Sequence, residues 1–210
     1  MRRAFLTAGI VTLSVVWLGP LPQLARTSFS AHMTMHMGVV AVAAPFLALG
    51  LGRTRFDPVR FAPLLFAPIV ASMVELIVVW AWHAPVLHHF ARHSTAGIVL
   101  EQSMFLWSGL LLWLSAFGGD GPQQSARRGA GVIALLLTSM HMTLLGALLA
   151  LSPRPVYHDT NELQVEALAD QHLGGAVMLI VGGVSYLAGG LALAVSLLRG
   201  GALETDEARL

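Results

Sequence analysis

Long apolar stretches separated by short polar breaks run through the whole chain. A helix needs about 18 or more apolar residues to cross a hydrocarbon core of about 30 Å, and we expect six such helices from the pattern. The predicted helices are Ala4–Gly19, Ala31–Leu51, Phe61–Trp82, Ala96–Phe117, Ala130–Leu151 and Gln171–Leu198. The breaks between them carry prolines, glycines and charged residues, which are typical of loops. The pattern therefore predicts an all-α fold, a polytopic transmembrane helical bundle in a single domain over residues 1–210.

The composition agrees with a membrane protein, since 56% of the 210 residues are hydrophobic and only 11% are charged. The first predicted helix is the shortest and follows Arg2 and Arg3, as a signal peptide would. No clear small-x-small cleavage site precedes Arg26, so we expect this segment to remain as a membrane helix.

The basic residues, which are all arginines, predict the orientation in the membrane. Cytoplasmic loops retain positive charge, and a cytoplasmic N-terminus places nine of the 12 arginines on the inner side. Only Arg26, Arg92 and Arg154 then lie outside, and residues 199–210 form a cytoplasmic tail. The net charge of +1 reflects this topology, and no basic patch or motif indicates a nucleic-acid partner.

Histidines gather on the outer side of this predicted topology. Of the nine histidines, only His141 lies near the middle of a predicted helix, and none lies in a cytoplasmic loop. The others begin helices or occupy outer loops: His32, His36, His83, His88, His89, His93, His158 and His172. This distribution indicates an outward-facing, histidine-rich site, with surface histidines that have no function as the alternative.

The stretch from His32 to Met37 carries two histidines and three methionines. Residues three and four apart share a helix face, so His32, Met35 and His36 form one cluster, with Met33 and Met37 on the adjoining face. Imidazole suits copper, zinc and iron, whereas thioether sulfur favours Cu(I). The chain has no cysteine, which excludes thiolate ligands and disulfides. The stretch therefore predicts a copper site, with methionines that only fill the core as the alternative.

Further polar groups lie in the outer halves of other predicted helices. With a rise of about 1.5 Å per residue, His36 lies about 7 Å, Glu101 about 8 Å, Glu75 about 10 Å and His141 about 15 Å below the outer helix ends, and His172 lies at the rim. Such groups are costly within a bilayer unless they pair, bind a cation or line a wet cavity. We expect Glu101, His141 and His172 to be metal ligands with Glu75 beside them. A hydrogen bond between helices is the alternative for both glutamates.

The segment between the third and fourth predicted helices is amphipathic from Pro85 onward. A helix there places Leu87, Phe90 and Ala91 on one face. It places a polar set on the other face: His88, His89, Arg92 and His93. We expect this helix to lie along the membrane surface with its polar face in water. The spacing of His89 and His93 also fits metal capture, but a solvated face is the simpler interpretation.

The last predicted helix contains paired glycines, among them Gly174, Gly175, Gly182 and Gly183. Glycines repeated along one face let another helix approach closely. We interpret them as packing residues and not as a phosphate loop, because they lie in an apolar helix without the strand and turn that such a loop requires.

Three segments carry specific motifs. They read FSAHMTMHMGVVAVAAPFLALG from Phe29, WHAPVLHHFARHSTAGIVLEQSMFLWSGLLLW from Trp82 and DQHLGGAVMLIVGG from Asp170. Their most specific parts are the histidine pair with the following Ala-Pro-x-x-x-Leu-Gly, the Trp-His-x-Pro element and the Asp-x-x-x-Gly-Gly-x-x-Met element. Together they resemble the CtaG-type family of bacterial cytochrome c oxidase assembly proteins, over most of the chain from Phe29 to Tyr186.

The resemblance implies a multi-pass protein of the bacterial inner membrane that handles copper during maturation of haem-copper oxidases. Residues that match the family's polar or motif positions are His32, His36, His83, Glu101, Asp170 and Met178. Gln102 stands where we expect a histidine, which weakens the case for a ligand from the fourth helix. Because the resemblance implies seven or more helices, a further helix, a second copy of the chain or a partner membrane subunit is expected to complete the bundle.

These observations predict a binding and delivery protein without catalytic turnover. Copper, as Cu(I), would be held on the periplasmic side and passed to a haem-copper oxidase subunit or another cuproprotein. One alternative is a membrane oxidoreductase with a histidine-rich iron or copper centre, and another is a cytochrome with His36 and His141 as haem ligands. A copper transporter is disfavoured, because the inner halves of the predicted helices carry almost no polar groups.

Overall fold

A computed structural model describes residues 1–119, 124–157 and 163–207, so His158 lies outside the described residues. The described chain is almost entirely helical. Its α-helices are α1 (Arg2–Leu18), α2 (Leu21–Leu24), α3 (Phe29–Met37), α4 (Ala44–Leu51), α5 (Pro68–Trp82), α6 (Pro85–His93), α7 (Thr95–Phe117), α8 (Gln124–Ala150), α9 (Gln164–Val177) and α10 (Gly183–Glu207). Two π-helical segments, η1 (Gly38–Ala43) and η3 (Met178–Gly182), join α3 to α4 and α9 to α10, and η2 (Pro58–Arg60) is a short 3-10 helix.

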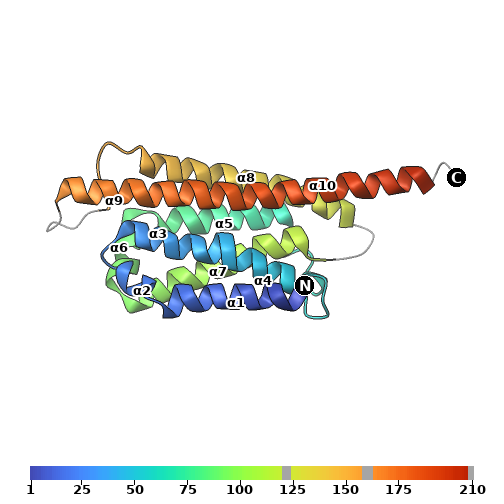
Figure 1. The fold of residues 1–210 in the computed structure, drawn as a ribbon, viewed down its shortest axis with the longest axis horizontal. Helices are drawn as coiled ribbons and strands as arrows, with labels where there is room; N and C mark the ends of the chain where they lie inside the picture. The colour runs from blue at the N-terminus through green and yellow to red at the C-terminus, as the bar shows by residue number, and fades with distance from the viewer. Residues whose placement is uncertain (120–123, 158–162, 208–210) are drawn as a thin grey trace.

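The helices form an elongated bundle, as the hydropathy pattern predicts (Figure 1). The long α9–α10 helix packs against α8 on one side of the bundle, and α1 packs along α4 on the other. The short helices α2 and α6 lie at one end, together with the N-terminal ends of α3 and α9. The N-terminus and the C-terminal end of α10 lie toward the opposite end.

Among the residues that the structure describes, four helical stretches are long and apolar enough to cross a membrane: Phe29–Leu51, Thr95–Phe117, Gln124–Ala150 and Gln164–Arg199. The pair α5 and α6 passes the same test when taken together, although the two helices meet at a bend of 72°. Helix α1 has 17 residues. The predicted count of six is therefore reached only when α1 and the bent pair are included with the four long stretches.

Several helix boundaries differ from the expected ones, and α8, for example, begins at Gln124 and not at Ala130. Helix α5 begins at Pro68 and not at Phe61, because proline is favoured in the first turn of a helix and disfavours helical geometry in the residue before it. The last helical stretch begins at Gln164 instead of Gln171 and continues to Glu207. Both extensions are more polar than the apolar core of the stretch, so the hydropathy pattern did not count them.

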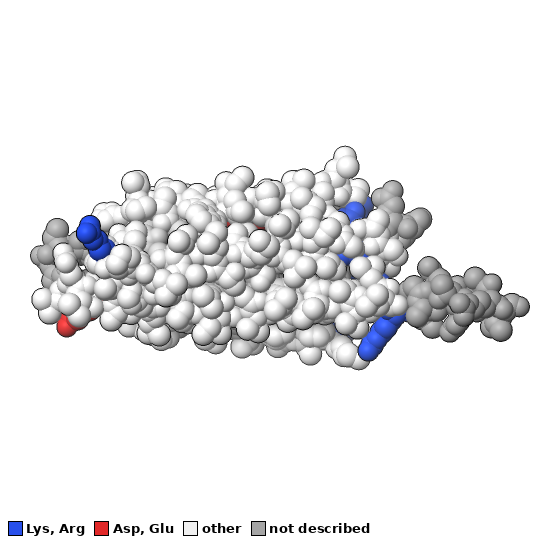
Figure 2. All heavy atoms as spheres, turned by 90° about the horizontal axis from the view of Figure 1, so that it is seen from above, with Lys and Arg blue, Asp and Glu red and all other residues white. Residues whose placement is uncertain are grey.

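Charged side chains gather at the two ends of the bundle and leave a broad uncharged surface between them (Figure 2). At the end that holds α2 and α6, Arg92 Nε donates to the Arg26 carbonyl at 3.1 Å. At the other end, Arg127 donates to the Phe66 carbonyl at 2.7 Å. The arginines that the sequence assigns to opposite sides of the membrane thus lie at opposite ends of the bundle.

The π-helical segment η1 is held by side chains from α7 and α10. The carbonyl of Val40 accepts a hydrogen bond from Trp113 Nε1 at 3.0 Å, and the Tyr186 hydroxyl, which donates to Glu75, lies 3.4 Å from the same carbonyl. The Ala41 carbonyl accepts from Ser185 Oγ at 2.6 Å. A wider turn alters the backbone hydrogen-bond pattern, and buried carbonyls need partners, so these side chains stabilise the wider turn inside the bundle.

Candidate metal centre

The N-terminus of α3 is fixed to α9 by one carboxylate. Asp170 accepts hydrogen bonds from the backbone N–H groups of Phe29 at 2.5 Å and Ser30 at 3.3 Å, and from the hydroxyls of Ser28 and Ser30. Ser28 in turn caps the helix by accepting from the Ala31 N–H. Charge-assisted bonds to a helix N-terminus are among the stronger hydrogen bonds in proteins. They set the position and rotation of the helix that carries His32 and His36.

Removal of this carboxylate is expected to destabilise the bundle. In an Asp170→Ala variant, the first N–H groups of α3 lose their acceptor, at a cost of about 2 kcal/mol. Thermal unfolding of the purified protein in detergent should therefore show a lower midpoint. Glu166→Ala is the control, because Glu166 is exposed on the same helix, and equal midpoints for the two variants would contradict the assigned role.

Three donor groups from α3, α6 and α7 converge beside this cap. His32, His88 and Glu101 are all buried, and each offers one ligand atom such that these atoms lie within 4.8 Å of one another. His32 Nε2 donates to Glu101 Oε1 at 3.0 Å, which leaves the lone pair on His32 Nδ1, a buried atom with no hydrogen-bond partner. Neither ring nitrogen of His88 has a partner either. Within the described part of the chain, no other group of this kind has three members.

Two more histidines and one sulfur atom extend this group. His36 is fully buried, stacks on Phe105 with ring centroids 3.8 Å apart, and lies 5.3 Å from the His83 ring. His83 Nδ1 donates to the Val79 carbonyl, and its Nε2 lies 3.4 Å from Met33 Sδ. Both His36 nitrogens lack hydrogen-bond partners. We call His32, His36, His83, His88, Met33 and Glu101 the histidine cluster.

Aromatic side chains cover the outer side of the histidine cluster. Tyr157, in the loop between α8 and α9, lies 4.2 Å from the His88 ring and stacks on Phe29 at 4.8 Å. Its hydroxyl donates to the His83 carbonyl at 2.5 Å. Burial raises the pKa of the Tyr157 phenol above its ordinary value, so the hydroxyl stays protonated and remains a donor at neutral pH.

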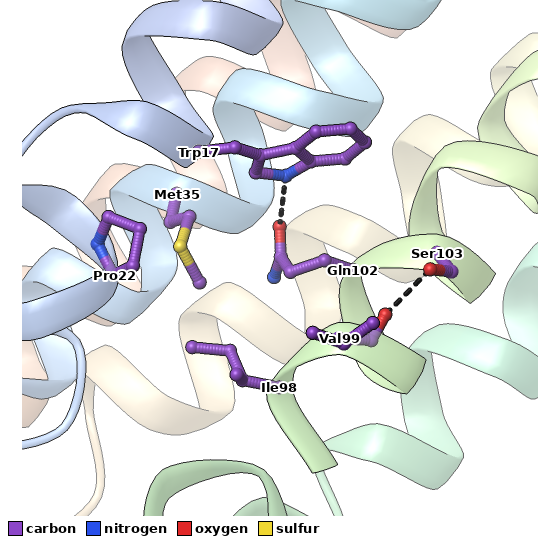
Figure 3. Close-up of a pocket in the computed structure, with 7 residues that line it drawn as sticks. All are labelled: Trp17, Pro22, Met35, Ile98, Val99, Gln102 and Ser103. Atoms are coloured by element: carbon purple, nitrogen blue, oxygen red, sulfur yellow. Dashed lines mark hydrogen bonds between the residues drawn. The ribbon is translucent and has the colours of Figure 1, made fainter. Parts of the chain in front are cut away.

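Gln102 connects the cluster to a pocket on the side of α1. It donates to Glu101 Oε2 at 3.2 Å and accepts from Trp17 Nε1 at 3.3 Å, so it holds the orientation of the carboxylate. The pocket has a volume of about 250 Å³ and is lined by Trp17, Pro22, Met35, Ile98, Val99, Gln102 and Ser103. Met35 points into this pocket (Figure 3), whereas Met33 is the methionine beside a cluster histidine.

The comparison with protein families decides the relationship that the sequence motifs suggest. Residues 1–200 match the family described as cytochrome c oxidase caa3 assembly factor (Caa3_CtaG). The chain belongs to this family. Searches of curated proteins and of solved structures found no match. The resemblance seen in the sequence is confirmed, and this multi-pass membrane protein is a cytochrome c oxidase assembly factor by family.

Besides Met35, two predicted metal ligands of this caa3 assembly factor, His172 and His141, lie away from the histidine cluster. His172 Nε2 donates to the Ser152 carbonyl at 2.9 Å, which ties it to the loop after α8. His141 is 7% exposed, its nitrogens lack partners, and it lines a largely apolar groove of about 710 Å³ together with Met73 and Met140. No described contact joins either imidazole to the cluster.

The remaining predicted residues of the assembly factor have packing or hydrogen-bonding contacts. Glu75 Oε1 accepts a hydrogen bond from the Tyr186 hydroxyl of α10 at 2.6 Å. This is a hydrogen bond between helices, the alternative role that the sequence analysis gave for this glutamate. Met37 and Met178 are buried in the core.

The four glycines face neighbouring helices, where a Cβ atom at Gly174, Gly175 or Gly183 would crowd side chains or backbone and one at Gly182 would make an ordinary contact. A Cβ at Gly174 would lie 2.4 Å from Phe29 and one at Gly182 would lie 3.5 Å from Met37 Sδ. A Cβ at Gly175 would meet the backbone of α8, and one at Gly183 would lie 2.9 Å from Thr143.

The sequence assigned His88 to a solvated face, and the structure contradicts this. His88 and Arg92 are 2% and 6% exposed, whereas Leu87 and Phe90 are 36% and 41% exposed. At a membrane surface, apolar side chains can face lipid while polar ones face the protein interior, which reverses the usual rule for an amphipathic helix. His88 and Arg92 are four residues apart and therefore share one face of α6, with the small residue Ala91 beside them. This spacing was the signal in the sequence that could have revealed the buried face.

Proposed function

We propose that this assembly factor binds copper at the histidine cluster and delivers it during maturation of its oxidase. The observation that supports the proposal most strongly is the convergence of buried imidazoles whose nitrogens have no hydrogen-bond partner: His32 Nδ1 and both nitrogens of His36 and of His88. Buried polar atoms without partners are costly. A bound cation would use these lone pairs and offset that cost.

The kinds of donor atom favour copper over other metals. The cluster offers imidazole nitrogens, one carboxylate and the thioether of Met33 beside His83, and the chain has no cysteine. Thioether and imidazole ligands suit Cu(I), while hard cations prefer oxygen ligands. The absence of thiolates also keeps binding weak enough for release, which a delivery protein requires.

The charge distribution supports an outward-facing site. Nine of the 12 arginines belong to segments that the sequence places in the cytoplasm. The cluster lies toward the end of the bundle that holds α2 and α6, which is opposite to the end where the chain begins. In this orientation the copper site faces the periplasm. The recipient would be the copper-binding subunit of the oxidase or another exported cuproprotein.

Metal analysis of the purified protein tests this proposal. In a competition titration with a Cu(I)-specific chelator, the protein is expected to hold copper, and its visible spectrum should lack the Soret band of a haem protein. Phe105 already stacks on His36, where a haem would have to bind. Two results together would contradict the proposal. The purified protein would bind no copper, and the oxidase of a strain that lacks this assembly factor would keep its full copper content.

A further inference from the structure

A second pocket opens beside the histidine cluster at the outer end of the bundle. It has a volume of about 150 Å³ and lies between α6 and the loop that precedes α9. Its lining consists of Pro85, His88, His89, Arg92, His93, Val156 and Tyr157. Val156 is held by its N–H, which donates to Gln171 Oε1 at 2.6 Å, so this wall of the pocket is anchored to α9.

His88 belongs both to this pocket and to the cluster. Its ring lies 4.8 Å from the His32 ring on the inner side and 4.2 Å from the Tyr157 ring. The residue is 2% exposed, and neither ring nitrogen has a hydrogen-bond partner. An ion that reached the pocket would therefore meet a cluster ligand directly.

A pair of histidines stands at the outer edge of the same pocket. His89 and His93 are exposed on α6, and their rings stack with centroids 4.0 Å apart. His93 Nδ1 donates to the His89 carbonyl at 2.9 Å. Two imidazoles one helical turn apart form a recognised type of surface metal ligand pair.

The pocket beside α1 is a poorer route for a cation. It is lined mainly by apolar side chains such as Ile98 and Val99, and Val99 is 59% exposed on the uncharged surface of the bundle. Carrying an ion through an apolar, lipid-facing opening is costly. The pocket on α6 instead offers an imidazole at each step.

Resting on the proposed function, we infer that copper enters and leaves the histidine cluster through the pocket on α6, with His89 and His93 as its capture ligands and His88 as the inner one. The Arg92 guanidinium, whose Nε donates to the Arg26 carbonyl, adds a positive charge to the wall. This charge opposes a resident cation there. The pocket is therefore a place of passage, and the ion is held deeper, where His88 meets His32 and Glu101.

Transfer kinetics of the full-length protein test this route. The protein is loaded with Cu(I), and release to a chromogenic Cu(I) chelator is followed by stopped flow; loading is followed in the reverse experiment. Replacement of His89 and His93 by alanine is expected to slow both directions about tenfold, because capture raises the local concentration of the ion. The equilibrium affinity and the copper stoichiometry should stay as in the wild type, because the pair is not the resident site.

A second variant widens the pocket instead of removing its ligands. Tyr157→Ala is expected to accelerate release to the chelator, since the ring that covers His88 is lost. Ile98→Ala is the matched control, because it widens the pocket beside α1 and should leave the release rate unchanged.

The outcomes separate this inference from the proposed function. Release that is unchanged by the His89 and His93 replacements, or accelerated by Ile98→Ala and not by Tyr157→Ala, overturns the route alone. A lower copper stoichiometry in the double variant also overturns it, because the pair would then hold copper itself. A wild-type protein that binds no copper overturns both the route and the proposed function.

Discussion

Alanine at His32, or at His88, is expected to weaken copper binding by at least about 100-fold, because loss of even an outer-shell partner costs about 10–100-fold. Each substitution removes one of the three donors that lie within 4.8 Å of one another. The remaining two donors cannot enclose the ion. A Cu(I) competition titration on the purified variants measures the change, with circular dichroism to verify that the helices are formed.

His141→Ala is the matched control for this experiment. It removes the same side chain from a position that is also buried, at 7% exposed, and whose nitrogens also lack partners. Since His141 lies outside the cluster, its replacement should leave copper affinity close to that of the wild type. If His141→Ala reduces binding as strongly as His88→Ala does, the assigned cluster is not the binding site.

Gly175→Val is expected to prevent normal assembly of the bundle. A Cβ at Gly175 would lie 2.5 Å from the backbone nitrogen of Ala150 and 2.8 Å from the Gly146 carbonyl oxygen. These neighbours are main-chain atoms, which cannot rotate away as a side chain can. We expect a loss of about 3 kcal/mol or more in stability, seen as a low yield of monodisperse protein by size-exclusion chromatography.

Gly129→Val provides the comparison within the same bundle. Gly129 lies in α8, and a Cβ there would have no heavy atom within 4 Å. Valine has a slightly higher helix propensity than glycine, so this variant should be as stable as the wild type or slightly more stable. Equal losses in the two variants would show that close approach of α8 and α9 is not the reason.

The positions of the membrane helices could be predicted because the hydropathy of a segment depends only on the residues in that segment. The apolar stretch Ala96–Phe117, for example, differs from α7 by a single residue at its start. The expected start at Phe61 was wrong because apolar residues around Pro63 continue the hydropathy signal, although the helix begins only at Pro68. Hydropathy measures affinity for lipid, whereas helix starts depend on backbone geometry.

The site could be predicted only in part, because depth along a helix does not give the direction of a side chain. Estimated depths placed Glu101 near His36, and the structure places Glu101 against His32. The same reasoning grouped His141 with them, but its side chain faces another groove. Tyr157 lies in a loop whose path the sequence does not determine, so its place over His88 could not be foreseen.

The π-helical segment η1 changes the direction in which side chains point between the two parts of one membrane helix, α3 and α4. Successive residues of an α-helix are rotated by about 100° around the helix axis. A wider turn with roughly one additional residue therefore rotates the side chains that precede it by about that angle relative to those that follow. His32 and His36 in α3 can therefore point into the cluster while α4 keeps its own packing face against α1. Deletion of one residue from Gly38–Ala43 would restore a regular α-helix and turn either the imidazoles or the packing face of α4 out of register.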